Sequence, residues 1–401
     1  MDINNAFLHG NLDEDIYMTP PDGYAAAPNL VCKLERSLYG LTRKLTDFSF
    51  RQSVHNQCLF LKPSPLGPMA LIVYVDDVLV TGPSIADISQ VKTYLYRLFT
   101  IKDLGDTRYF LGLEIARGDS GIFISQTKYI MDIIRDTGLV QAKSVSTPPP
   151  TSLKLSSASV VVLGLHSPPK FSQSVYLTQP CDAHWHVALH VNSFALRAFC
   201  DADWASCVDS KCSLTGFCVF LGDALVSWKT KKQPTISRST AEAEYCSLAA
   251  TVYELRWLSY ILAEFDIPLS LPIYLFCDNK AMLHILVNPV FHERTKHIEL
   301  DCHLVRDAYK EGFISPSFVS SSLQLADIFT KSLPLKSFAL IRSKLGLVLF
   351  DTNPTCGGMM EYLSSSSSNR QSSCRTQSSK KMVIRVKEIL ASLTQDKSFF
   401  A

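Results

Sequence analysis

Residues 71–80, LIVYVDDVLV, place two adjacent carboxylates in the middle of an otherwise apolar run. The apolar residues 71–75 and 78–80 predict two short buried strands joined as a hairpin. Asp76 and Asp77 at its tip adopt the positive φ angles of a two-residue turn poorly, so backbone preference does not explain them. Two interpretations stay open: an acidic tip in solvent, or a divalent cation held by carboxylates that would otherwise repel each other.

The composition is that of a globular protein, with 401 residues, 47% of them hydrophobic and 19% charged, enough for two or three domains. A net charge of +2 provides no global basic field, so any nucleic-acid surface must be local. The 12 cysteines form no Cys-x-x-Cys pair, which indicates a reducing compartment without a disulfide framework. We find neither a signal segment nor a transmembrane stretch, and therefore expect an intracellular protein that does not cross a membrane.

The chain divides into four successive segments. The first alternates short apolar strands with amphipathic stretches such as 85–99, and it ends in STPPP, which continues neither a helix nor a central strand. The third opens with strands, continues into a helical pattern at 241–264 and returns to a strand at PIYLFCD, an alternation typical of an α/β layer fold. The expected segments are a first domain at 1–150, a degenerate connection at 151–194, a second domain at 195–348 and a Ser-rich, disordered tail at 349–401.

Nine stretches in order along the chain resemble one family. MDINNAFLHGNLDEDIYMTPPDGY, KLERSLYGL, IVYVDDVLVTG and IKDLGDTRYFLGLEI are similar to successive parts of a reverse transcriptase. FCDADWASCVDSKCSLTGF, ISRSTAEAEYCSLA, IYLFCDNKAML, RTKHIELDCHLVRD and LQLADIFTK are similar to a ribonuclease H. The whole series resembles the Pol polyprotein of copia-type LTR retrotransposons. The resemblance implies an α+β palm/thumb remnant of a reverse transcriptase, followed by an α/β ribonuclease H-like domain with a mixed five-stranded sheet.

In the first half, the resemblance assigns Asp2 and Asp76 as ligands of two Mg²⁺ ions, with Asp77 as the adjacent catalytic carboxylate and Mn²⁺ as an alternative ion. Phe7 matches an aromatic residue that selects the nucleotide by blocking a ribose 2′-hydroxyl; a plain core aromatic is the other interpretation. A single residue precedes Asp2, and SLYGL runs directly into TRKLTDFSF, without the family's stretch against the incoming nucleotide. Because catalysis needs ligands held within about 0.5 Å, we expect a truncated and internally deleted polymerase that has lost its activity.

In the second half, the resemblance assigns four carboxylates as catalytic ligands of two Mg²⁺ ions: Asp201, Glu244, Asp278 and Asp327. Two of them follow apolar strands, and the carboxyl ends of strands are where an α/β sheet gathers ligands. Glu242 and Asp203 are close competitors in sequence. We prefer Glu244 because of its expected position on the inward side of the helix, and Asp201 because it directly follows the buried run.

Nucleic-acid contacts are expected from the segment SWKTKKQPTISRS, which combines an aromatic ring with positive charge. The candidate contact residues are Trp228, Lys229, Lys231, Lys232 and Arg238; the alternative is a solvated charged face. His186 and His190 have the i, i+4 spacing of a metal pair on a helix, but the glutamate of His-Glu-x-x-His is missing. We interpret them as a remnant of the family's connecting helix.

Two functions remain in competition. The first is a retrotransposon-derived fragment whose polymerase is inactive and whose second domain hydrolyses RNA in RNA–DNA hybrids with two metal ions. The second is a non-catalytic transposon relic that binds nucleic acid weakly at most. Intact carboxylates favour the first for the second domain, whereas the missing segments favour the second for the chain as a whole.

Overall fold

The structure, a computed structural model, describes residues 2–3, 10–18, 32–37, 39–74, 77–118, 121–125, 127–136, 184–189, 193–287 and 299–350. The backbone forms two compact units, of which the first comprises Met1–Phe110 with Glu264–Asp266 and the second Leu111–Ala263 with Ile267–Ala401. STPPP and the Ser-rich tail lie outside the described residues, and the domain limits expected from the sequence stay predictions.

The first unit contains a six-stranded sheet with the order β4-β5-β6-β7-β1-β8. Its strands are β1 (Asp2–Ile3), β4 (Arg51–Gln52), β5 (Leu59–Lys62), β6 (Met69–Tyr74), β7 (Asp77–Thr81) and β8 (Ile101–Lys102). The hairpin expected at 71–80 is confirmed, because β6 and β7 pair antiparallel. Asp77 differs from the expectation, however: it is the first residue of β7 and pairs with Tyr74, so it belongs to the ladder and not to the tip.

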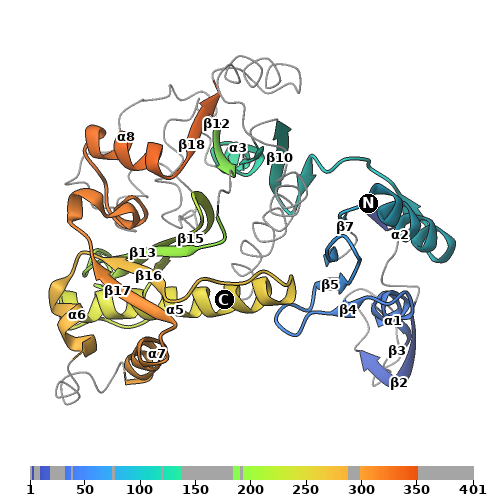
Figure 1. Cartoon of the computed structure of the whole chain (residues 1–401), viewed down its shortest axis with the longest axis horizontal. Helices are drawn as coiled ribbons and strands as arrows, with labels where there is room; N and C mark the ends of the chain where they lie inside the picture. The colour runs from blue at the N-terminus through green and yellow to red at the C-terminus, as the bar shows by residue number, and fades with distance from the viewer. Residues whose placement is uncertain are drawn as a thin grey trace. The chain divides into compact units, whose positions relative to one another are not determined.

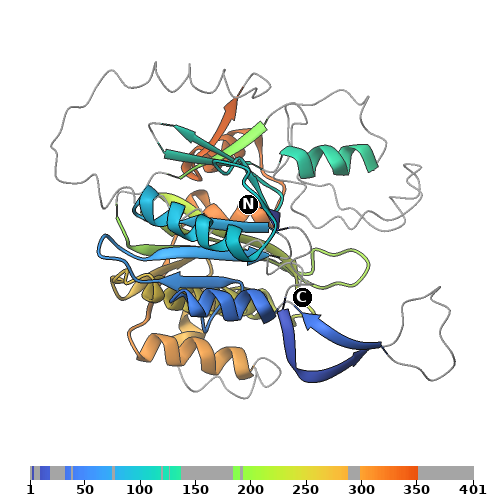
Figure 2. The same ribbon diagram turned by 90° about the vertical axis from the view of Figure 1, so that its right-hand side faces the viewer.

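Helices cover the hydrophobic side of this sheet. Helix α1 (Tyr39–Asp47) and helix α2 (Ile85–Leu98) contribute Leu45 and Leu95 to a core that also contains Leu71 of β6. The amphipathic stretch at 85–99 therefore forms the predicted helix, and its first turn begins where the Ser84 hydroxyl accepts a hydrogen bond from a backbone N–H. Figure 2 shows α2 lying along the strands. The remaining strands of the unit are β2 (Gly10–Met18), β3 (Cys32–Ser37) and β9 (Tyr109–Phe110).

The second unit is built on a five-stranded sheet with the order β15-β14-β13-β16-β17. Its strands are β13 (Leu196–Asp203), β14 (Leu214–Leu221), β15 (Ala224–Lys232), β16 (Ile273–Cys277) and β17 (Ile314–Phe318). The first three pair antiparallel, whereas β13 with β16 and β16 with β17 pair parallel. The mixed five-stranded sheet expected from the sequence is confirmed.

Helix α5 (Thr240–Glu264) is the long helix that the apolar pattern at 241–264 predicts. Leu248, Val252, Leu255 and Leu262 recur at helical spacing and are fully buried. Figure 1 shows α5 running alongside the strands of the mixed sheet. Every residue of β14 is buried, which is expected for an inner strand with both faces covered. The other helices are α6 (Lys280–Val287), α7 (Glu299–Lys310) and α8 (Leu335–Lys344), with 3₁₀ turns η5 (Ser321–Leu323) and η6 (Leu325–Phe329).

A second sheet of this unit contains β10 (Leu113–Gly118), β11 (Gly121–Ser125), β12 (His184–Leu189) and β18 (Leu347–Phe350), with helix α3 (Thr127–Asp136) following β11. β12 lies between β11 and β18 and pairs antiparallel with both. The helical interpretation of His186 is therefore wrong, because HWHVAL completes a ladder between two strands that are distant in sequence; His190 lies outside the described residues. Among the helices described, none is long and apolar enough to span a membrane.

Candidate metal centre

Two strands carry the same tripeptide into the site. Phe199-Cys200-Asp201 lies in β13, and Phe276-Cys277 ends β16 with Asp278 directly after it. The parallel register pairs Phe199 with Phe276. The two rings stack with centroids 4.9 Å apart. Because side chains repeat every second residue along a strand, the matched register brings Asp201 and Asp278 to the same level of the sheet. Asp201 lies within its strand, because β13 continues beyond the apolar run to Asp203.

Glu244 reaches the same place from the first turns of α5. Its helix is fixed to β13 one turn later, where the Ser247 hydroxyl donates a hydrogen bond of 2.8 Å to the backbone carbonyl of Asp201. Glu242, the other candidate, caps the start of the helix instead, because its carboxylate accepts a hydrogen bond of 2.9 Å from the backbone N–H of Arg238. The preference for Glu244 over Glu242 thus agrees with the position of both side chains.

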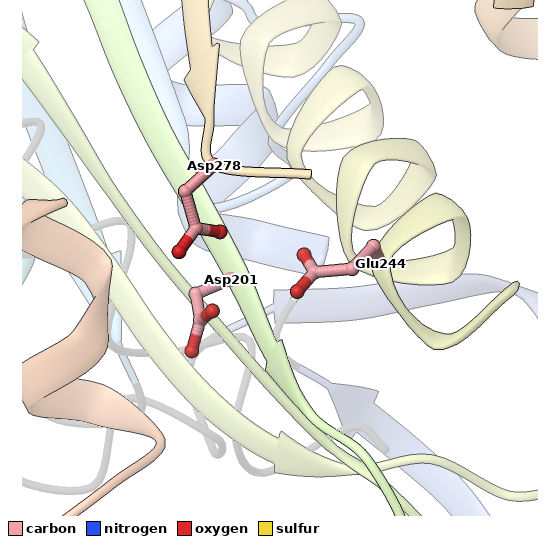
Figure 3. Close-up of side chains that lie close together, drawn as sticks. All are labelled: Asp201, Glu244 and Asp278. Atoms are coloured by element: carbon pink, nitrogen blue, oxygen red, sulfur yellow. The ribbon is translucent and has the colours of Figure 1, made fainter. Parts of the chain in front are cut away.

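The carboxylates of Asp201, Glu244 and Asp278 converge, as Figure 3 shows, and each offers one oxygen within 4.8 Å of the others. Asp201 and Glu244 are buried, and Asp278 is partly exposed. Asp278 accepts a hydrogen bond of 2.8 Å from the Ser321 hydroxyl. Oε2 of Glu244 is buried and finds no hydrogen-bond partner in the part of the chain that the structure describes. A buried oxygen without a donor, facing two carboxylates, is a position that fits a cation.

Asp327 stands beside these three residues and is joined to them by a lysine. The ammonium of Lys331 lies 2.9 Å from Oδ1 of Asp201 and 2.9 Å from Oδ1 of Asp327. The Thr330 hydroxyl donates to the other oxygen of Asp201. Asp327 belongs to the turn η6 and is buried. Of the four predicted ligands, the structure therefore groups three directly and connects the fourth through Lys331.

The charges of this cluster act strongly on one another. Burial raises the pKa of Glu244 to about 9, and the charges of Asp201 and Asp278 act in the same direction. Burial also raises the pKa of Asp327 to about 6, together with the charge of Asp201, while Lys331 opposes the shift. Burial alone would lower the pKa of Lys331, but the two neighbouring carboxylates outweigh it and raise that pKa. Without added cations, the cluster therefore retains protons that a bound cation would displace.

The expected polymerase residues are only partly within the described chain. Asp76 and Phe7 lie outside it, and only the backbone of Asp2 is described. The backbone register of β1 and β7 pairs Asp2 with Asp77. The segments that carry the two acidic motifs are thus neighbours in one sheet, while the roles assigned to Asp2, Asp76, Asp77 and Phe7 stay predictions.

The expected nucleic-acid contacts do not share one face. Along β15, alternation places Trp228 and Lys232 on one side of the sheet and Lys229 and Lys231 on the other. On the first side, the Thr230 hydroxyl donates to the carbonyl of Phe329 in η6, next to the carboxylates. On the second side, the pKa of Lys229 is lowered, mainly by burial and to a smaller extent by the charge of Lys231. Arg238 is exposed in the loop before α5.

Sequence reasoning missed Lys331, Thr330 and Ser321. The i, i+4 spacing of Asp327 and Lys331 in LADIFTK is a signal for a local ion pair. Nothing in that stretch indicates the contact with Asp201, which is separated from Lys331 by 130 positions.

Comparison with known proteins relates both halves to one class. Residues 1–150 match the family model described as reverse transcriptase (RNA-dependent DNA polymerase). The chain is 34% identical to the retrovirus-related Pol polyprotein from transposon RE2 of Arabidopsis thaliana, over 90% of this chain and 28% of that protein. It is 28% identical to the corresponding polyprotein from transposon TNT 1-94 of Nicotiana tabacum, over 86% of this chain and 30% of that protein. The chain thus spans less than a third of the length of these relatives.

Among solved structures, RNase H1 from Halobacterium salinarum NRC-1 is 18% identical, with 34% of this chain and 94% of that protein covered and a TM-score of 0.26.

Proposed function

Since the chain belongs to the Pol polyproteins of copia-type LTR retrotransposons, we propose that its second unit hydrolyses the RNA strand of RNA–DNA hybrids with the help of divalent cations. One observation carries the proposal: three carboxylates from β13, α5 and the end of β16 converge within 4.8 Å, and one of their buried oxygens lacks a donor among the described residues. Carboxylate oxygens are the ligands that Mg²⁺ and Mn²⁺ prefer.

Asp201, Glu244 and Asp278 would hold the cation, and Asp327 would complete the acidic set. When bound, a divalent cation supplies positive charge for the attack of water on a phosphodiester and for the departing oxygen. The chain contributes the placement. Ser247 holds the backbone of Asp201 from α5, and the side chain of Gln324 holds the backbone of Cys200 through a bond of 2.9 Å. This double attachment keeps the central carboxylate of the cluster in one position, as ligation of a cation requires.

The hybrid would approach along the edge strand β15. Lys231, Lys232 and Arg238 are exposed there and in the following loop, and Trp228 is partly exposed. The positive charges of these side chains would attract the phosphates of the hybrid. Lysine contacts with phosphate bind without reading the base sequence, so the proposed hydrolysis is not sequence-specific.

The proposal does not extend to DNA synthesis. Family members place a stretch against the incoming nucleotide after SLYGL, whereas here that motif passes directly into TRKLTDFSF. We therefore propose that the first unit is inactive as a polymerase, whatever ions Asp2, Asp76 and Asp77 bind.

The test is cleavage of a labelled RNA–DNA hybrid by the full chain with Mg²⁺ or Mn²⁺, with single-stranded RNA and DNA duplex as substrate controls. Asp278→Asn should lower the rate by at least about 100-fold, because even indirect support of a metal ligand is worth 10–100-fold. Asp307→Asn is the matched control, since Asp307 is an exposed carboxyl on α7. Hybrid cleavage that is unaffected by Asp278→Asn would overturn the proposal. No cleavage by the wild type would favour the non-catalytic relic instead.

A further inference from the structure

The carboxylate cluster contains two groupings that share Asp201. The first consists of Asp201, Glu244 and Asp278, where Oε2 of Glu244 lacks a donor within the described chain. The second consists of Asp201 and Asp327, and here the gap between the carboxylates is already filled by the ammonium of Lys331 at 2.9 Å from each. In the second grouping, the chain itself therefore supplies the positive partner.

An ammonium and a divalent cation cannot share the second grouping. Mg²⁺ needs oxygen ligands at about 2.0–2.1 Å, so an ion bridging the same two oxygens would lie in the space that Nζ of Lys331 occupies. Two positive charges at that separation would also repel each other strongly in a buried setting. Binding of an ion between Asp201 and Asp327 thus requires that Lys331 leaves.

Hydrogen bonds hold the backbone from which the Lys331 side chain extends. The N–H of Lys331 donates to the carbonyl of Asp327 at 2.9 Å, and the N–H of Thr330 donates to the same carbonyl at 3.1 Å. The same segment is attached to β13 by the Gln324 side chain and by the Thr330 hydroxyl. The Lys331 side chain is 35% exposed while that of Asp201 is fully buried, so departure of the ammonium would leave a buried carboxylate with one charged partner fewer.

We propose that Lys331 takes the place of a second metal ion: the site binds a single divalent cation among Asp201, Glu244 and Asp278, and the Lys331 ammonium supplies the positive charge between Asp201 and Asp327. The inference rests on the proposed function, because it concerns the same carboxylates. It makes Lys331 a positioning residue that holds Asp201 and Asp327, and it sets the number of ions that the site takes up.

Counting bound ions tests the proposal without relying on activity. Mn²⁺ is titrated into the full chain, and the free ion is measured by its electron paramagnetic resonance signal. Every protein titrated also carries Asp2→Asn, Asp76→Asn and Asp77→Asn, so that no ion at the first unit is counted. On this background the chain with the wild-type second unit should bind one Mn²⁺ with high affinity. Lys331→Ala should bind a second, with the second affinity raised at least about 10-fold, the scale of an effect on a metal ligand from its neighbour. Lys331→Arg, which keeps the charge, and Lys336→Ala, which removes an exposed lysine of α8, should both bind one.

Each outcome separates this inference from the proposed function. If the wild type binds two ions of similar affinity, Lys331 yields to metal and the inference is wrong, while the proposed function stands. If Lys331→Ala folds, by circular dichroism, and still binds one ion, the inference is also wrong. Should Asp278→Asn bind as many ions as the wild type, the three carboxylates are not the metal site and the proposed function itself fails. The wild-type count and the Lys331→Arg variant keep the test decisive if Lys331→Ala does not fold.

Discussion

Replacing Glu244 by glutamine should stabilise the metal-free protein at neutral pH while abolishing its response to metal. Glu244 is 6% exposed, one of its oxygens has no hydrogen-bond partner among the described residues, and two carboxylates face it. Burial and these charges raise its pKa from 4.5 to about 9. Between those two values the folded protein binds a proton that the unfolded chain does not bind, so the free energy of unfolding falls as the pH rises.

The size of the effect follows from the two pKa values. Each pH unit between them lowers the free energy of unfolding by about 1.36 kcal/mol, so a rise from about pH 5 to about pH 8 costs about 4 kcal/mol. Because glutamine does not titrate, the free energy of unfolding of Glu244→Gln does not fall with pH for this reason. The difference in stability between variant and wild type should therefore grow in favour of the variant by about 4 kcal/mol over that range.

Urea unfolding in the presence of EDTA, followed by tryptophan fluorescence, measures this difference. All 4 tryptophans of the chain lie in the second unit, so the signal reports the unit that contains Glu244. Addition of Mg²⁺ at about 100 times its dissociation constant should stabilise the wild type by about 2.7 kcal/mol and leave the variant unchanged. Asp307→Asn serves as the control for an exposed carboxyl. A stability difference between Glu244→Gln and wild type that stays constant with pH would refute the reasoning.

Three further substitutions test the supports of the fold. Ser247→Ala removes a buried hydroxyl that donates to the backbone of β13, and should cost about 1–2 kcal/mol in urea unfolding. Gly216→Ala would place a Cβ 2.5 Å from the Thr330 side chain, so we expect a loss of about 1–3 kcal/mol and weaker Mn²⁺ binding. In the first unit, the hydrogen bond from Lys92 at 2.7 Å lowers the pKa of Asp103. The ionised carboxylate therefore stabilises the fold above the unfolded pKa near 3.8, and this stabilisation is lost as the pH falls. Asp103→Asn should therefore cost about 0.5 kcal/mol at neutral pH, discounted for exposure, and nothing near pH 2, as thermal unfolding would measure.

Much of the fold could be predicted because its elements follow local periodicity. The helical pattern at 241–264 corresponds to α5, and the alternation in PIYLFCD corresponds to β16, with Ile273, Leu275 and Cys277 buried and Tyr274 exposed. The register in which strands pair was harder to predict from the sequence. The sequence assigns Asp77 to the turn of the first hairpin, whereas it is the first residue of β7, because residues at the end of an apolar run fit a strand and a turn almost equally well.

Contacts between distant segments escaped sequence reasoning for a different reason. The composition of HWHVAL does not distinguish a strand from a helix. The segment forms strand β12 because it pairs with β11 and β18 on either side. The division of the β15 contacts between two faces, in contrast, was available from the period of two. The contact of Lys331 with Asp201 could not be predicted from the sequence, because it depends on the path of η6 across the sheet.

The repeated tripeptide Phe-Cys-Asp is the feature on which the site depends. Strands β14 and β15 and the whole of α5 separate the two copies in sequence, yet the sheet order makes β13 and β16 neighbours. Parallel pairing aligns Phe199 with Phe276, so identical residues meet and both aspartates point where Glu244 arrives from the helix. A slip of one residue would turn every side chain of one strand to the other face. The stacked phenylalanine rings therefore add a cross-strand contact in the register that brings the two carboxylates together, where they can bind a common cation.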